Sequence, residues 1–159
     1  MTALLFLDVD GPLLPFGGPP GQYPAADPGD PNPLLARLDP GHGPRLRALP
    51  AALVWATTWE DQANEVLAPR LGLPRLPVVH WPEEDEDEPI GQHWKTGPLV
   101  GWAAGRPFAW VDDELTDADR RWVAQHHPAP ALLHRIDARY GLRPDDYAIL
   151  TAWLTRCQA

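Results

Sequence analysis

Short apolar runs alternate with longer amphipathic stretches along this chain of 159 residues. Each apolar run is bounded by proline, glycine or acidic residues, which is typical of strands buried on both faces of a parallel sheet. The longer stretches carry capping-box-like helix starts, Thr58 with Asp61 and Thr116 with Asp119. The pattern predicts strands at Leu4–Val9, Ala52–Ala56, Leu76–His80, Phe108–Val111 and Ala131–Ile136, and helices at about 60–71, 98–104, 117–126 and 144–155.

Alternating strands and helices predict an α/β fold. A mostly parallel, Rossmann-like sheet of about five strands would lie between helices on both of its faces, in three layers. The length suits one domain with a packed core, so we expect residues 1–159 to form a single domain.

A segment rich in proline and glycine interrupts the pattern after the first strand. Between Pro15 and Pro44, 9 prolines and 6 glycines make up half of the residues. Regular sheet or a long helix is excluded there, apart from a short helix candidate at Pro33–Leu38. The segment is either a tethered loop across the carboxyl edge of the sheet or a disordered insertion, and its place after the first acidic motif favours the loop. We expect residues 12–45 to form a flap or a small cap-like insertion.

Charge and composition narrow the function classes. The formal net charge is −9, and six of the acids form one run, Glu83–Glu88, which is typical of a solvated loop. The sequence lacks a basic stripe, so it carries no strong nucleic-acid-binding signature. The one cysteine, Cys157, cannot form an internal disulfide, which fits a reduced, cytoplasmic setting. No apolar stretch approaches the length of a membrane span, so no membrane partner is expected.

The first chemical signal is the pair Asp8 and Asp10, which follows the first strand and precedes Gly11. Because strand side chains alternate, the two carboxylates leave the strand end on the same side. Their repulsion would be relieved by a shared proton or by a hard divalent cation, of which Mg²⁺ is the usual occupant of such oxygen sites. A bare Asp-x-Asp is more often an acidic turn.

Three further motifs follow in order. Thr57 and Thr58 come directly after the second strand, where a hydroxyl and free amides can hold a phosphate oxygen or simply cap a helix. Lys95, the only lysine of the chain, stands just before a helix and could neutralise a phosphate or lie exposed on the surface. Asp112 and Asp113 follow the fourth strand and could supply further metal ligands.

These four motifs, each at the carboxyl end of a strand or the helix start beyond it, occupy the edge where open α/β sheets bind ligands. The ordered set, from Leu4 to about Asp113, resembles the haloacid dehalogenase-like (HAD) hydrolase superfamily, in a small, nearly capless, phosphatase-type form. The resemblance implies that Asp8 attacks phosphorus to form an aspartyl-phosphate, and that Asp10 acts as general acid and then base. It also implies that Asp8, Asp10 through its backbone carbonyl, Asp112 and Asp113 bind Mg²⁺.

The same resemblance implies that Thr57 or Thr58 binds the transferring phosphoryl group, with Thr57 preferred because it comes first. Lys95 would hold that group and the nucleophile together. We therefore expect a magnesium-dependent phosphohydrolase acting on phosphoric monoesters, whose substrate is a phosphorylated small molecule or a nucleic-acid end.

Alternatives remain at this level. A nearly capless site suggests a bulky substrate, such as a 3′-phosphate nucleic-acid end of the kind that repair phosphatases process, or a lid from a partner subunit of a homo-oligomer. A catalytically silent HAD-like binding or scaffold domain is a further alternative.

Trp59 and Trp94, next to the motifs, could offer a stacking surface. Four histidines lack metal-ligand spacing and are assigned structural or surface roles: His80, His93, His126 and His127.

Overall fold

The computed structural model describes residues 2–82 and 93–158, so the acidic run Glu83–Glu88 lies outside the described residues. Its elements are β1 (Leu4–Leu7), 3₁₀ helix η1 (Pro33–Arg37), α1 (His42–Arg47), β2 (Ala52–Trp55), π-helix η2 (Ala63–Leu67), α2 (Ala68–Leu71), α3 (Thr96–Ala103), β3 (Phe108–Asp112), α4 (Asp117–His126), β4 (Ala131–Arg135) and α5 (Pro144–Cys157).

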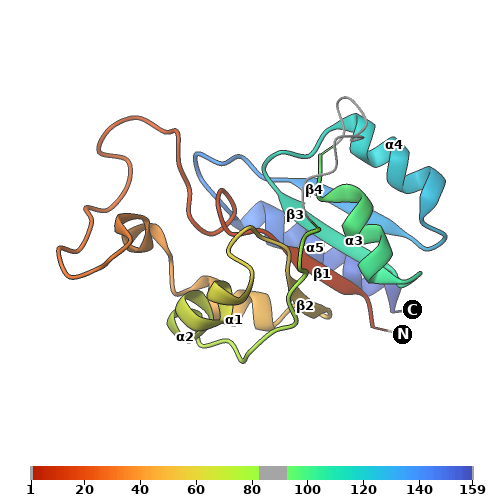
Figure 1. The fold of residues 1–159 in the computed structure, drawn as a ribbon, viewed down its shortest axis with the longest axis horizontal. Helices are drawn as coiled ribbons and strands as arrows, with labels where there is room; N and C mark the ends of the chain where they lie inside the picture. The colour runs from red at the N-terminus through yellow and green to blue at the C-terminus, as the bar shows by residue number, and fades with distance from the viewer. Residues whose placement is uncertain (1, 83–92, 159) are drawn as a thin grey trace.

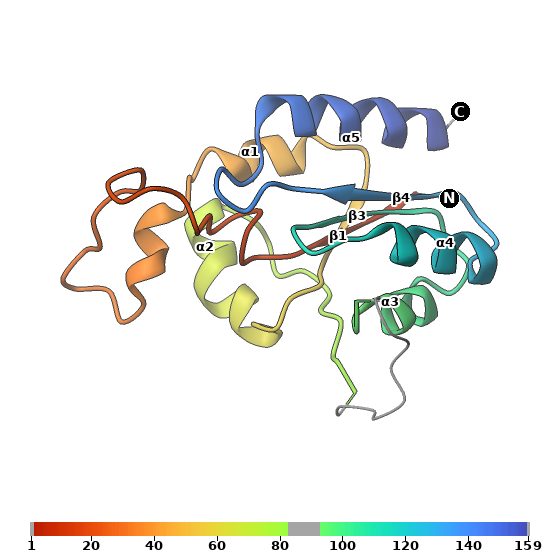
Figure 2. The same ribbon diagram turned by 90° about the horizontal axis from the view of Figure 1, so that it is seen from above.

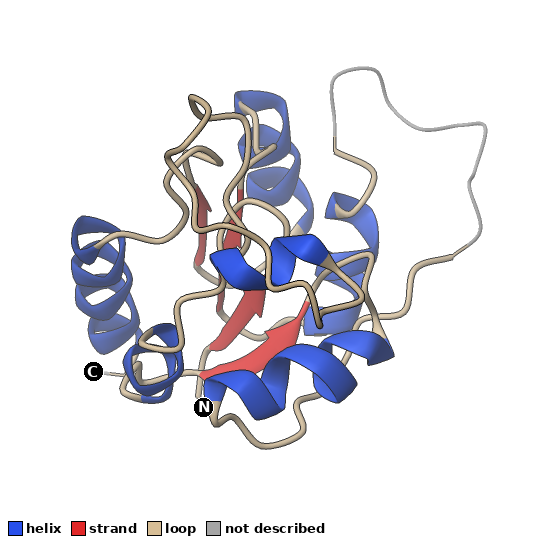
Figure 3. Cartoon of the chain, turned by 90° about the vertical axis from the view of Figure 1, so that its left-hand side faces the viewer, coloured by secondary structure: helices blue, strands red, loops and turns tan. Residues whose placement is uncertain are grey.

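The predicted parallel α/β arrangement is confirmed. Four parallel strands form one sheet in the order β2-β1-β3-β4, and helices lie on both sides of it (Figure 1; Figure 3). The prediction of a fifth strand at Leu76–His80 is wrong. That segment makes a single bridge beside β2, with Val78 opposite Trp55. Because Pro77 has no N–H to donate, the ladder cannot continue as a regular strand.

The alternation of side chains along β1 divides the core into two halves. Leu5 and Leu7 pack with residues of α1 and α5, including Leu46 and Leu150, on one face of the sheet. Leu4 and Phe6 pack on the other face with residues of α3 and α4. Viewed along the sheet, α1 and α5 lie on one side and α3 and α4 on the other (Figure 2). All four β1 side chains are buried, as expected for a central parallel strand.

The helices match the expected positions with local differences. The last two occur where predicted, and Thr116 with Asp119 forms the predicted capping box of α4. The helix expected at 60–71 contains the π-helix η2, because Pro69 cannot donate to the preceding turn and its ring crowds the carbonyl four residues earlier. At its start Thr57, rather than Thr58, accepts a backbone hydrogen bond. Helix α1 was not predicted, and no helix among the described residues has the length and apolar character needed to cross a bilayer.

Up to Gly41 the Pro/Gly-rich segment is a tethered loop with one 3₁₀ turn, but the prediction that it lies across the carboxyl edge of the sheet is wrong. It extends outward from the carboxyl ends of the strands rather than lying across them (Figure 1). Its near part is fixed to the loop between β4 and α5, where the Phe16 amide donates to the Ala138 carbonyl at 2.8 Å and the Tyr23 hydroxyl donates to the Arg139 carbonyl at 2.9 Å. In its far part, Asp30 forms an ion pair with Arg70 of α2 at 2.8 Å.

Gly141 holds the β4–α5 loop against the turn after β1. Its φ is +69°, and a Cβ there would lie 2.7 Å from the carbonyl oxygen of Pro12. We expect Gly141→Ala to lower the free energy of unfolding by clearly more than Gly72→Ala. Gly72→Ala is the control, because Gly72 has φ +67° but no atom within 4 Å of a Cβ built there. It should lose only about 1–2 kcal/mol, the cost of holding an alanine in the left-handed region. Urea unfolding measures both variants; equal losses would contradict the close approach.

Candidate functional site

The sheet register brings the predicted motifs into one row. Leu7 of β1 pairs with Trp55 of β2 and Val111 of β3, so the residues one position further along the three strands, Ala56, Asp8 and Asp112, are neighbours. The row is continued by Arg135, which pairs with Asp112 across β3 and β4. Neighbouring positions in a parallel sheet project to the same face. Asp8 and Asp112 are therefore adjacent because of main-chain pairing alone, and the Thr57 motif follows Ala56 directly.

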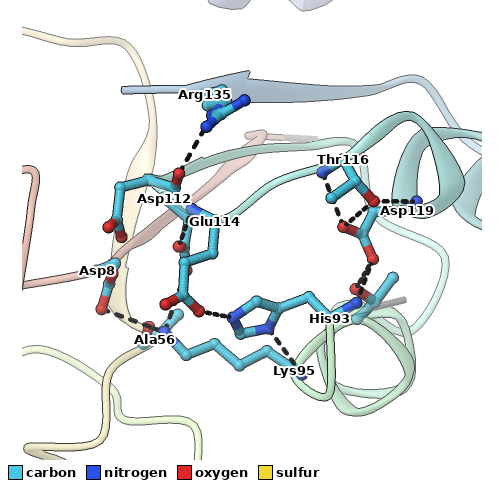
Figure 4. A network of polar contacts seen from close by, with 11 residues as sticks. Asp8, Ala56, His93, Lys95, Asp112, Glu114, Thr116, Asp119 and Arg135 are labelled. Carbon is cyan, nitrogen blue, oxygen red and sulfur yellow. Dashed lines mark hydrogen bonds and ion pairs between the residues drawn. The ribbon is translucent and has the colours of Figure 1, made fainter. Parts of the chain in front are cut away.

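Lys95 completes this row from the start of α3. Its ammonium donates to Asp8 Oδ1, the Ala56 carbonyl oxygen and Asp112 Oδ2, each at 3.1 Å (Figure 4). The three donors of an ammonium group are thus all used. The side chains of Lys95, Asp8 and Asp112 are 5%, 8% and 1% exposed, which separates this contact from a screened surface ion pair.

A second network fixes the backbone that carries Lys95. His93 Nδ1 accepts a hydrogen bond from the Lys95 amide at 3.1 Å, so its Nε2 carries the proton that is donated to Glu114 Oε2 at 2.8 Å (Figure 4). The buried Asp119 accepts from the His93 amide at 2.7 Å and from the Thr96 hydroxyl at 2.9 Å. Because Asp119 also caps α4, it locks the starts of α3 and α4 together.

Sequence reasoning missed this supporting network. The sequence pattern identifies Asp119 only as a helix cap and His93 as a structural or surface residue, and it assigns no role to Glu114. The one available signal was the spacing of His93 two positions before Lys95, which allows its ring to reach the Lys95 amide. The contact between His93 and Asp119 joins residues 26 positions apart and has no local signature.

Three carboxylates gather beside the ammonium. Asp8, Asp112 and Asp113 each place an oxygen within 4.8 Å of the others. Asp113 comes this close because Gly11, with φ +104°, has no Cβ; one built there would lie 2.8 Å from Asp113 Cγ. When ionised, the three acids and Lys95 leave two negative charges uncompensated, the charge of one divalent cation. Carboxylate oxygens are also the ligands that Mg²⁺ prefers, so the donor set fits the expected ion.

Burial and the neighbouring charges shift the pKa values of the clustered groups. Burial, together with the nearby Asp112 charge, raises the pKa of Asp8 well above its usual range, against the opposing effect of Lys95. Burial alone would lower the pKa of Lys95, but the charges of Asp8 and Asp112 raise it, so the ammonium stays protonated. Burial and the Asp112 charge raise the pKa of Asp113 from 3.8 to about 6.

The remaining predicted residues lie around this cluster. Asp10 is half-buried and accepts a hydrogen bond from Trp59 Nε1 at 3.4 Å; its side chain does not belong to the three-carboxylate group. Thr57 is buried directly after Ala56, and its carbonyl accepts from Trp81 Nε1 at 3.0 Å, whereas Thr58 is exposed. The structure thus brings Asp8, Lys95, Asp112 and Asp113 together, places Thr57 next to them, and leaves Thr58 outside.

Two indole rings lie near the buried ammonium. The Trp81 and Trp94 ring centroids each lie 5.7 Å from Lys95 Nζ, within the range of a cation–π contact. The two rings meet edge to face, with centroids 5.0 Å apart. With Trp59 beside Asp10, three tryptophans flank the predicted site residues.

None of the protein-family models, curated proteins or solved structures compared with this chain gives a significant match. The resemblance to HAD hydrolases therefore rests on the four sequence motifs.

Removing the Lys95 ammonium should destabilise the folded state, because the buried acids would then repel one another without a counter-charge beside them. We expect Lys95→Met to lower the metal-free free energy of unfolding at pH 7 by about 3–5 kcal/mol, because the buried Asp8 and Asp112 carboxylates lose the ammonium group that pairs with both. Chemical denaturation measures the loss. The double variant Asp8→Asn/Lys95→Met should recover part of it by removing one of the acids, and a Lys95→Met protein as stable as wild type would contradict the assigned contact.

The raised pKa of Asp113 predicts a pH dependence. Its folded pKa of about 6 exceeds the ordinary 3.8, so the folded state binds more protons between these values and the ionised carboxylate opposes folding above pH 6. Metal-free Asp113→Asn should therefore be more stable than wild type at pH 7.5, by about 1 kcal/mol after allowing for solvent screening of this half-buried group, and the gain should vanish below about pH 4. Urea unfolding across this pH range, with the exposed Glu65→Gln as control, checks the sign; a gain that persists at pH 4 would contradict it.

Proposed function

We propose that this protein is a Mg²⁺-dependent phosphohydrolase of the HAD type, which hydrolyses phosphoric monoesters through a phosphorylated Asp8. One observation carries the proposal: the buried Asp8 carboxylate is hydrogen-bonded to the Lys95 ammonium and lies beside two further carboxylates at the carboxyl edge of a parallel sheet. A structural acidic turn needs neither a buried lysine nor a third acid from another strand.

In the first step, an Asp8 oxygen forms a bond to phosphorus while the bond from phosphorus to the leaving oxygen breaks. Asp10 gives its proton to that oxygen, so the alcohol departs neutral. In the second step, Asp10 takes a proton from water as the water oxygen attacks phosphorus, and the bond to Asp8 breaks. Phosphate is released, and Asp8 and Asp10 return to their starting states.

The neighbouring groups supply charge and position. A carboxylate repels a phosphate dianion, and Lys95 offsets this repulsion because its ammonium already contacts the attacking carboxylate at 3.1 Å. Thr57, at the turn after β2, would bind the transferring phosphoryl group. Asp8, Asp112 and Asp113, with the Asp10 backbone carbonyl, would hold Mg²⁺, which neutralises negative charge on the phosphoryl oxygens when bound.

The assigned nucleophile predicts a sharp loss of activity. Asp8→Asn should reduce Mg²⁺-dependent phosphate release from an aryl phosphate by at least about 10³-fold, because an amide cannot form the covalent intermediate. Asp10→Asn should reduce kcat by about 10²–10⁴-fold through loss of proton transfer, while Mg²⁺ affinity measured by calorimetry stays close to wild type.

The matched control is Asp61→Asn, an exposed acid that pairs with His80. It should leave phosphate release unchanged. Equal activity of wild type and Asp8→Asn would exclude the enzyme assignment for such substrates. If wild type is inactive but beryllium fluoride with Mg²⁺ binds wild type and Asp8→Asn equally, the chain is instead a silent scaffold.

A further inference from the structure

An arginine-lined pocket adjoins the carboxylate cluster. Its volume is about 570 Å³, within the range of small-molecule binding sites. Arg135, at the end of β4, and Arg139 and Arg143, on the loop that leads to α5, line the pocket together with Asp113. Because Asp113 belongs to both the pocket and the carboxylate cluster, a ligand in the pocket lies beside the group that Asp8 would attack.

The other acids of the pocket are already engaged. Asp137 accepts two hydrogen bonds from the Arg139 side chain, at 3.1 and 2.8 Å. Asp146 accepts from the Arg143 amide at 2.8 Å, and its other oxygen contacts His134 Nε2 at 2.8 Å. The Arg139 guanidinium is thus paired with Asp137, and both oxygens of Asp146 already have hydrogen-bond partners.

Two guanidinium groups remain available. Arg135 donates through Nε to the Asp113 carbonyl at 3.2 Å, which orients the side chain and leaves its two terminal nitrogens for a ligand (Figure 4). Arg143 lies over the Tyr140 ring at 4.9 Å, a contact that leaves the guanidinium edge available. Neither arginine forms an ion pair with an acid among residues 2–82 and 93–158. Guanidinium groups bind phosphate through paired, charge-assisted hydrogen bonds.

The loop between β4 and α5, which leads from Arg135 to Arg143, is held in place relative to the motif after β1. The Leu142 amide donates to the Pro12 carbonyl at 2.9 Å, and Gly141 allows that close approach. On its other side the loop accepts hydrogen bonds from Phe16 and Tyr23 of the Pro/Gly-rich segment. The distance between the pocket and Asp8 is thus fixed by backbone contacts, as a two-point substrate site requires.

We propose that this pocket binds a second phosphate group, carried on the leaving-group part of the substrate. The inference rests on the proposed function and deepens it: the preferred substrate is a small organic bisphosphate, whose reacting phosphate meets Asp8 while its other phosphate contacts Arg135 and Arg143. The three arginines of the pocket balance its three aspartates in formal charge, and the two arginines without an ion pair among the described residues, Arg135 and Arg143, are the groups that would accept the second anion.

The test measures affinity, so it does not depend on turnover. Calorimetry at fixed free Mg²⁺ compares propane-1,3-bisphosphonate and hexane-1,6-bisphosphonate with propylphosphonate and hexylphosphonate. Wild type should bind at least one bisphosphonate about tenfold more tightly than its monophosphonate partner. Arg135→Gln/Arg143→Gln should abolish this preference, whereas Arg121→Gln/Arg156→Gln, the same charge change at exposed positions of α4 and α5, should preserve it. Equal preference in wild type and the double variant would overturn the proposal.

A phosphatase assay and a titration with a larger ligand distinguish failure of the proposed function from binding of a nucleic-acid end. If wild type shows no phosphatase activity that Asp8→Asn removes, the proposed function fails, while an arginine-dependent bisphosphonate preference still supports the pocket as a phosphate site. A 3′-phosphorylated oligonucleotide forms a second arm of the same titration. If only the oligonucleotide shows arginine-dependent affinity, the assignment to small bisphosphates is wrong.

Discussion

The ammonium of Lys95 is the contact on which the site depends. A lysine buried this deeply needs acceptors for all three of its protons, and it finds them at the ends of β1, β2 and β3. Conversely, Asp8 and Asp112 would face each other across adjacent strands without a counter-charge. Each charge makes the burial of the others tolerable, so the lysine and the two acids form one unit rather than separate ion pairs.

The sheet and its helices supply the geometry for that unit. Parallel pairing sets Asp8, Ala56 and Asp112 side by side, and the network of His93, Glu114 and Asp119 holds the backbone of Lys95 above them. The turn after β1 lets Asp113 join the cluster because Gly11 has no side chain. The same turn receives the β4–α5 loop, so the arginine pocket and the carboxylates share one rigid edge of the sheet.

The fold class and the cluster of Asp8, Lys95 and Asp112 could be predicted because both depend on short stretches of sequence around each strand end. Asp8, Lys95 and Asp112 each follow an apolar strand or precede a helix, and the carboxyl ends of parallel strands meet at one edge. The strand predicted at Leu76–His80 was wrong because an apolar run of this length is typical of a strand, whereas Pro77 limits its pairing to one bridge. The roles of His93 and Asp119, and the gathering of Arg135 with Arg143, depend on tertiary contacts that no spacing reveals.

The solitary lysine has a chemical consequence. All other basic side chains apart from histidine are arginines, so the described surface presents guanidinium groups and no side-chain amine. An acylating reagent selective for amines has one side-chain target in this protein, and that amine is enclosed by its three acceptors and two indole rings. The rate at which Lys95 is acylated therefore reports how often this edge of the sheet opens, with no competing signal from other lysines.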